Sequence, residues 1–256
     1  MSFAPDSALD VAIVPAANVE DRRDGRAPDI LLLHYTGMRD AAKAVEWLAR
    51  AESKVSCHYV IDNEGRITQM VPESKRAWHA GVSSWHCDTD MNSASIGIEI
   101  HNPGHDMGYP DFPAAQVASV IRLGLDVVRR HRIRPERVLA HSDIAPMRKI
   151  DPGEKFPWDT LAAAGLGAWV PPSPIRHDGY GLTLGADGSG VRLAQAMLQH
   201  YGYDLTPTGT FGDRTAHVVR AFQRHFRPGL VDGRIDLSTL ATLERLLEIS
   251  GNSHTG

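Results

Sequence analysis

Short apolar runs alternate with longer amphipathic segments in the N-terminal part of the chain. Residues 29–36 (DILLLHYT) and 57–72 (CHYVIDNEGRITQMVP) are rich in aliphatic and β-branched residues, and the NEG triplet of the second is typical of a hairpin turn. In residues 95–100 (SIGIEI) three isoleucines alternate with Gly97 and Glu99, as in a strand whose two faces differ. All three segments are therefore predicted to be strands.

Helical periodicity is present between and after these strands. Residues 40–50 (DAAKAVEWLAR) and 112–131 (FPAAQVASVIRLGLDVVRRH) repeat apolar positions every three or four residues, and Pro113 stands near the first turn of the longer segment. The apolar stripe of that segment consists of Val117, Val120, Ile121, Leu125 and Val128. Strands that alternate with helices predict an α/β fold, a mixed central sheet with flanking helices.

The segment between Trp158 and Gly190 is rich in Pro, Gly and Asp and has no sustained period, which is typical of a linker. We therefore expect an α/β domain in residues 1–165, a linker in residues 166–187 and a small domain in residues 188–256.

Three helical segments follow one another in this small domain, and Ser238 is the expected N-cap of the third. Three helices in about 60 residues lie near the lower limit of independent stability. The apolar positions expected to be buried are Leu193, Met197, Leu198, Tyr201, Val218, Val219, Phe222, Leu240, Leu243 and Leu247.

Composition excludes several classes of protein. The chain has 256 residues, 42% of them hydrophobic and 23% charged, with a net charge of −4, as in an ordinary globular protein and unlike a nucleic-acid-binding one. No apolar run approaches the roughly 18 residues that a membrane span needs. Because the N-terminus lacks a basic segment followed by an apolar one, we expect a cytoplasmic protein in which Cys57 and Cys87 are free thiols.

Two histidines stand where predicted strands end. His34 follows ILLL and His141 follows VLA, and strand ends are where clefts open in α/β sheets. Asp151 lies in a DPG turn ten positions after His141. A single histidine is more often structural, but two imidazoles and one carboxylate form a recurring catalytic zinc set that leaves a fourth position for water. The bound metal lowers the pKa of that water from about 15.7 to about 7.

Amide hydrolysis also needs a base and a group that stabilises the oxyanion. Glu99 is the candidate base, because an unpaired carboxylate in an apolar strand is costly and the neighbouring Gly97 leaves room for a ligand. A Glu paired across an exposed sheet face is an equally good interpretation. Lys149 can reach the same cleft as Asp151 and stabilise a tetrahedral intermediate, although an isolated loop lysine is more often only solvated. Arg148 is expected to point outward.

Four ordered motifs carry a resemblance to a known family. HYT (34–36), CHYVIDNEGRITQMVPESKRAWHAG (57–81), SIGIEIHNPG (95–104) and HSDIAPMRKIDPG (141–153) resemble the bacterial zinc-dependent N-acetylmuramoyl-L-alanine amidases of the type-2 amidase family, relatives of the peptidoglycan recognition proteins. The resemblance covers roughly residues 30–158. Residues 190–247 are similar to the three-helix peptidoglycan-binding module found beside many cell-wall hydrolases.

This resemblance implies that His34, His141 and Asp151 hold Zn²⁺, that Glu99 and Lys149 are catalytic, and that Trp78 or His79 contacts substrate. For Trp78 a core position is the usual alternative. Tyr59 is expected either near the metal or in the core. The expected substrate is the amide between N-acetylmuramic acid, in its 1,6-anhydro form, and L-alanine, and the expected partners are muropeptides or peptidoglycan. The alternatives are an inactive muropeptide recognition protein, a zinc peptidase and a periplasmic wall hydrolase.

Overall fold

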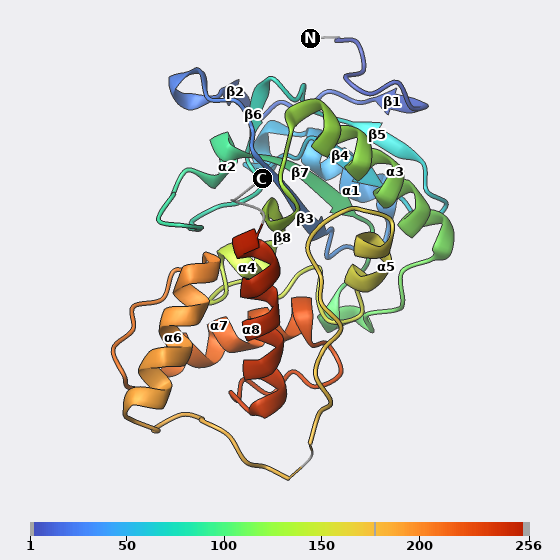
Figure 1. Ribbon diagram of the computed structural model, residues 1–256. Coiled ribbons are helices and arrows are strands. Elements are labelled where there is room, and N and C mark those ends of the chain that lie inside the picture. Colours follow the sequence, from blue (N-terminus) through green and yellow to red (C-terminus); the bar gives the residue numbers. More distant parts are fainter. Residues whose placement is uncertain (1–2, 177, 253–256) are drawn as a thin grey trace.

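The computed structural model describes residues 3–176 and 178–252, an α/β layer structure followed by three helices (Figure 1). Within these residues a six-stranded sheet has the order β1-β5-β4-β7-β3-β8, in which only β4 and β5 are antiparallel. In that order the strands are Val11–Ile13, Ile67–Gln69, Tyr59–Ile61, Ser95–Ile100, Ile30–Tyr35 and Val138–Ala140. A separate antiparallel pair consists of β2 (Val19–Asp21) and β6 (Lys75–Ala77).

The predicted strands and the mixed α/β class are confirmed. Residues 29–36 contain β3, residues 95–100 are β7, and residues 57–72 form the antiparallel hairpin of β4 and β5 around the NEG turn. Strands β1, β2 and β6 were not predicted, because three residues are too few to establish an alternating pattern.

The two predicted helices of the α/β part are present as α1 (Ala41–Ala49) and α3 (Ala114–His131). The carboxylate of Asp40 accepts a hydrogen bond from Lys43 N at 3.0 Å and so caps α1. Shorter helices are α2 (Met91–Ala94), α4 (His141–Ile144) and α5 (Trp158–Ala163), and the single 3₁₀ turns are Arg23–Gly25, Ala51–Ser53, His105–Met107 and Pro135–Arg137.

The buried face of α3 differs from the predicted stripe. Of the five stripe residues only Val120 is fully buried, and the other four are half-buried. The face that packs on the sheet also includes polar and small residues. One of them, Gln116, donates hydrogen bonds to the carbonyls of Ile61 and His101. The stripe predicted from apolar residues alone is therefore rotated about the helix axis relative to the face of α3 that is buried. The fully buried residues are Gln116, Ser119, Val120, Leu123, Gly124 and Val127.

The three C-terminal helices are α6 (Ser189–Tyr201), α7 (Asp213–Phe226) and α8 (Leu237–Asn252). Two predictions for them were wrong. Leu193 is 59% exposed, because Val191, Ala194 and Leu198 form the inner face of α6. Asp236, not Ser238, caps α8, since its Oδ1 accepts a hydrogen bond from Thr239 N at 2.7 Å. The buried positions predicted on α7 are confirmed, with Val218, Val219 and Phe222 all fully buried.

The two faces of the sheet have different partners. On one face Leu31, Leu33 and Ile98 pack with α3 and α5. On the other face Ile30 and Leu32 belong to a hydrophobic core that continues into α6, α7 and α8. The C-terminal helices therefore pack against the α/β part on the side of this second sheet face, next to α4 (Figure 1).

No helix in residues 3–176 and 178–252 is both long and apolar enough to cross a membrane. The two cysteines are unpaired, with Cys57 buried and Cys87 exposed. Within the predicted linker Leu166 and Val170 are buried, so part of this segment packs on the folded body. The proposed domain boundaries remain a prediction.

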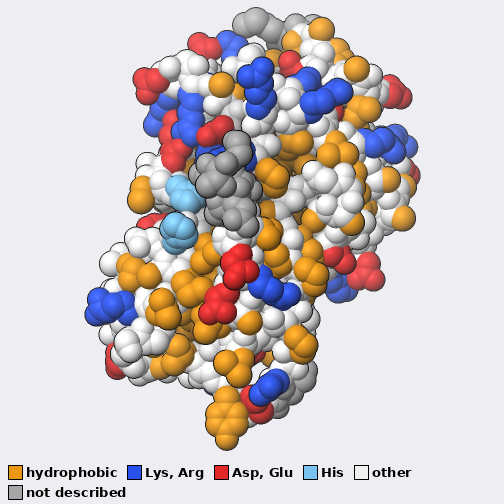
Figure 2. Space-filling model, in the orientation of Figure 1, with side chains coloured by type: hydrophobic (Ala, Val, Ile, Leu, Met, Phe, Trp, Pro, Cys, Tyr) orange, Lys and Arg blue, Asp and Glu red, His pale blue; other side chains and the backbone are white. Residues whose placement is uncertain are grey.

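Charged side chains of both signs are interspersed over the α/β part of the face shown in Figure 2. Exposed pairs such as Arg66 with Asp62 and Lys75 with Asp21 contribute little to stability, because water screens them. The folded state therefore depends mainly on the apolar core and on a few buried polar groups.

One of these buried groups is Glu73, which is 2% exposed. Its carboxylate accepts hydrogen bonds from Tyr59 OH at 2.7 Å, from the Arg130 guanidinium and from His131 Nε2 at 2.6 Å. Burial alone would raise the pKa of Glu73, but these hydrogen bonds outweigh it and lower the pKa to about 2. Tyr59 thus takes the core position of the two that the sequence allowed.

Replacing Glu73 by glutamine is expected to lower the free energy of unfolding by about 3 kcal/mol at pH 7, because the buried carboxylate that binds Arg130 and His131 is lost and Arg130 keeps only its pair with Asp126. Since the folded-state pKa lies below the usual 4.5, this stabilisation is present above pH 4.5 and is lost as the pH falls toward 2. Urea unfolding at pH 7 and pH 3 measures both effects. The exposed Glu64→Gln change is the control, and an equal loss at the two pH values would contradict the assignment.

Candidate metal centre and active site

The predicted site residues converge at the carboxyl ends of three parallel strands. His34 is the penultimate residue of β3 and lies beside Glu99 of β7 in the strand register. His141 follows β8 directly as the first residue of α4. Alternation along β3 places His34 on the face opposite Leu33. The sheet therefore positions both histidines and Glu99 on one face, at one edge.

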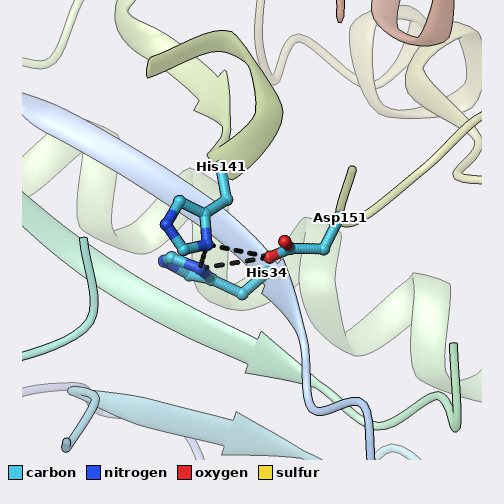
Figure 3. A group of neighbouring side chains, drawn as sticks. All are labelled: His34, His141 and Asp151. Atoms are coloured by element: carbon cyan, nitrogen blue, oxygen red, sulfur yellow. Dashed lines mark hydrogen bonds and ion pairs between the residues drawn. The ribbon is translucent and has the colours of Figure 1, made fainter. Parts of the chain in front are cut away.

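His34, His141 and Asp151 form a compact buried cluster (Figure 3). The Nδ1 atoms of the two histidines are 2.9 Å apart, and Asp151 Oδ2 lies 3.0 Å from His141 Nδ1 and 3.4 Å from His34 Nδ1. Their exposed fractions are only 1%, 3% and 5%. Three donor atoms thus point at one another in a space that the protein encloses.

The cluster has the donor chemistry and spacing of a zinc site. Ligands that lie ~2.0–2.2 Å from a tetrahedral zinc ion are ~3.3 Å from one another, close to the separations observed here. Burial and the nearby His141 lower the pKa of His34 to about 4, so its imidazole is neutral at pH 7 as a metal ligand must be. Burial would raise the pKa of Asp151, but the two histidines lower it well below its usual value. These three residues could hold a metal ion.

Each histidine of the cluster is oriented through its outer ring nitrogen. His141 Nε2 donates to the carbonyl of Ala80 at 3.2 Å, and His34 Nε2 lies 3.0 Å from His79 Nδ1. Such contacts leave Nδ1 free to face the cluster and fix the ring plane. The carbonyl of Ala80 and the ring of His79 therefore support the two candidate ligands from behind.

The space beside Gly97 is filled by His79. A Cβ atom at position 97 would lie 2.5 Å from His79 Nδ1, a distance at which something must shift. The room that the small residue was expected to leave for a ligand is thus occupied by an imidazole. His79 is 8% exposed, and burial together with His34 and His58 lowers its pKa well below the usual value.

Glu99 carries an unpartnered carboxylate oxygen on the same face. Its Oε2 atom is buried and accepts no hydrogen bond from the described residues. Burial and the charge of Asp151 raise the pKa of Glu99 well above its usual value, and Lys149 acts in the opposite direction. Of the two interpretations that the sequence allowed, the one in which Glu99 pairs across an exposed face is therefore wrong, since Glu99 has no ion-pair partner in the described part of the chain.

Lys149 and Arg148 leave the same turn in different directions. Lys149 is half-buried and lines a groove together with His141, Trp78 and His79. Arg148 is exposed and donates to the carbonyls of Val82 and Ala80. Arg148 thus links the loop after His141 to residues 80–82. The Ala80 carbonyl in that segment also accepts the hydrogen bond from His141 Nε2.

This groove, which the cluster reaches through His141, has a volume of about 400 Å³. It shares Arg76, Gly81 and Arg148 with a second hollow of about 490 Å³, which reaches Asp204 and Arg214 near α7. Trp78 lies along the groove, half-buried, and its Nε1 atom has no hydrogen-bond partner among the described residues. A ligand can therefore extend from the groove beside His141 toward the C-terminal helices.

A buried set of two imidazoles and one carboxylate, opening on a groove at the edge of a mixed sheet, is the arrangement of metallohydrolases. Residues 24–154 match the family model described as N-acetylmuramoyl-L-alanine amidase. The chain belongs to the N-acetylmuramoyl-L-alanine amidase family and is an enzyme of that activity. Residues 187–243 match a family of peptidoglycan binding domains, as the C-terminal motifs predicted.

Proteins similar to this chain share both of its parts. The N-acetylmuramoyl-L-alanine amidase AmiD of Escherichia coli (strain K12) is 40% identical over 87% of this chain and 83% of its own length. The structure of AmiD with the substrate anhydro-N-acetylmuramic acid-L-Ala-D-gamma-Glu-L-Lys has a TM-score of 0.74 at 37% identity, covering 91% and 93% of the two chains. AmpDh3 from Pseudomonas aeruginosa in complex with anhydromuramic pentapeptide has a TM-score of 0.72 at 33% identity, covering 89% and 94%.

Proposed function

We propose that this enzyme hydrolyses the amide between 1,6-anhydro-N-acetylmuramic acid and the L-alanine of a stem peptide, in the recycling of muropeptides. The observation that carries the proposal is the buried cluster of His34, His141 and Asp151 beside the unpartnered carboxylate of Glu99. The anhydromuramyl ligands bound to AmiD and AmpDh3 support the anhydro form of the sugar.

In this proposal His34 and His141, through Nδ1, and Asp151, through Oδ2, hold a zinc ion. Family membership and the spacing of the three donors support this choice of metal. When bound, zinc polarises a carbonyl and makes hydroxide available at neutral pH.

Glu99 is proposed to act as the general base and then as the general acid. Its buried, unpaired Oε2 atom can accept a proton from the attacking water as the water oxygen adds to the lactyl carbonyl. The same carboxyl then delivers that proton to the nitrogen of L-alanine as the carbon–nitrogen bond breaks. A raised pKa suits this exchange, because the group must hold the proton between the two steps.

The residues that line the groove are proposed to bind and position the substrate. Lys149, which lines the groove beside His141, stabilises the oxyanion of the tetrahedral intermediate. Trp78 contacts substrate through the part of its ring that lines the groove, since its Nε1 atom is buried. Both ring nitrogens of His79 face protein atoms, at His34 and Ser95, so this residue contributes a wall of the groove and the orientation of His34.

The cytoplasm is the proposed compartment, with the periplasm as the alternative. Two unpaired cysteines, one of them exposed, are compatible with a reducing environment. Soluble anhydro fragments as substrates would agree with it, whereas polymeric peptidoglycan would favour the periplasm. Cell fractionation that finds the native protein outside the inner membrane would overturn this part of the proposal.

The zinc-loaded full chain is expected to cleave a purified anhydromuramyl tripeptide into the free sugar and an intact peptide that begins with L-alanine. Mass spectrometry of the products identifies the bond that is cut. A parallel incubation with intact sacculi compares polymeric with soluble substrate. Faster release from the soluble fragment is expected.

Two results would contradict this function. Cleavage within the stem peptide would indicate a zinc peptidase, and binding of the fragment without any product would indicate a recognition protein. Incubation after removal of metal by a chelator is the control, and it should give no product until zinc is restored.

A further inference from the structure

The C-terminal domain contacts the segment that carries His141 through one buried carboxylate. Asp143 lies two residues after His141 in α4 and is fully buried. Its Oδ1 accepts a hydrogen bond from Tyr203 OH at 2.7 Å, and its Oδ2 accepts one from His225 Nδ1 at 2.7 Å. The remaining partner is local, Ala140 N at 2.8 Å. Two of these three hydrogen bonds therefore come from residues 60 and 82 positions away in the sequence.

A carboxylate without partners at this depth would be strongly destabilising, so the position of Asp143 depends on its donors. Tyr203 is 1% exposed and its ring packs edge-on against Trp85 at 5.0 Å. His225 is likewise 1% exposed and belongs to α7. Because both donors lie in packed surroundings, neither can follow a movement of α4 without disturbing its neighbours.

Helix α7, which carries His225, also contacts the segment that carries Asp151. The ring of His225 stacks on Trp158, the first residue of α5, with the ring centres 3.7 Å apart. One residue earlier in α7, Arg224 Nε lies 3.8 Å from a carboxylate oxygen of Glu154, which is three residues after Asp151. Helix α7 thus contacts the chain immediately downstream of two of the three candidate ligands.

Apolar packing reinforces these polar contacts. Ile144 and Ala145, which follow Asp143, belong to the same buried core as Val218 and Phe222 of α7. An interface of this kind resembles the interior of one domain more than the contact between two tethered modules.

We propose that the C-terminal domain positions the metal centre, with Tyr203 and His225 as positioning residues that act through Asp143 on His141. This function is additional to peptidoglycan binding, and it rests on the proposed function only in that the cluster binds zinc. The domain fixes the position of the loop that carries His141. In other metal sites, hydrogen bonds to the ligands from surrounding residues orient those ligands in the same way.

The test compares full-length, zinc-loaded variants. Tyr203→Phe removes one hydroxyl and keeps the ring. His225→Phe keeps a ring that can stack on Trp158 and removes the Nδ1 donor, and because His225 Nε2 has no partner among the described residues, the change loses no second hydrogen bond. His225→Asn restores a donor near the Nδ1 position without the ring. Tyr201→Phe is the matched control, since Tyr201 is buried in the same domain and donates no hydrogen bond to Asp143 or another described residue.

Zinc affinity is measured by competition with a chromophoric chelator, and the geometry of the site is measured by the absorption spectrum after Co²⁺ is substituted. The Tyr203→Phe/His225→Phe double variant is expected to bind zinc about 10- to 100-fold more weakly and to show an altered Co²⁺ spectrum. Each single variant should show a smaller loss, and His225→Asn should bind more tightly than His225→Phe. Tyr201→Phe should match the unmodified chain.

Unchanged zinc affinity and an unchanged Co²⁺ spectrum in the variants would overturn the proposal. The proposed function would stand in that case, because the unmodified enzyme would still cleave its substrate. An equal loss in Tyr201→Phe would also overturn it, because the effect would then be a general loss of stability. Should the double variant fail to fold, the two single variants, checked by circular dichroism, decide the question. Absence of zinc binding in the unmodified chain would instead reject the proposed function itself.

Discussion

Replacing Glu99 by glutamine is expected to reduce kcat by a factor of about 10²–10⁴ while the bound zinc is retained. Glutamine has nearly the same shape, but it cannot take a proton from water and return it to the leaving amine. Glu99 contributes no donor atom to the cluster, so metal content should not change. Steady-state kinetics on the anhydromuramyl tripeptide and zinc analysis of the same sample measure the two quantities.

The exposed Glu52→Gln change is a suitable control for loss of one negative charge. Its kcat should equal that of the unmodified enzyme. If Glu99→Gln retained full turnover, another group would have to be the base. If it lost zinc in parallel with activity, Glu99 would act on the metal centre rather than on the proton.

Replacing Asp151 by asparagine is expected to cause the other large loss, at least about 10³-fold in kcat/KM at micromolar zinc. The change removes the charged oxygen donor and leaves two buried imidazoles. Zinc affinity should fall together with activity, and excess zinc should restore part of the turnover. Competition with a chelator and activity titrations with added zinc measure this.

The exposed Asp159→Asn change, eight positions further along, should leave zinc affinity and turnover unchanged. An Asp151→Asn enzyme that bound zinc as tightly as the original would show that His34 and His141 have a different third partner.

The two histidine ligands could be predicted from sequence because their positions follow from strand ends. An apolar run that stops at a histidine fixes both the element and the edge of the sheet, as it does for His34 after β3 and His141 after β8. Glu99 was a candidate because it alternates with isoleucines in a strand, but the same pattern allowed a Glu paired across an exposed face. The choice between the two depended on the structure, in which Glu99 Oε2 is buried and has no partner among the described residues.

Contacts across long sequence separations were not predictable in this way. His79 lies behind His34 at a separation of 45 residues, and its motif indicated substrate contact rather than support of a ligand. The hydrogen bonds of Asp143 join positions that have no common local pattern. Small errors had a local cause, since at Leu193 a helical period alone could not establish which face of α6 meets its neighbours.

Gly97 and His79 are 18 positions apart, yet the absence of one carbon atom in the first makes room for the ring of the second. A substitution at either position therefore changes the packing around the other. Any side chain at 97 would force the imidazole out of its present place beside His34, and a smaller residue at 79 would leave an empty space beside the strand. The size of the residue within β7 therefore sets how close to the strand the imidazole outside the sheet can lie.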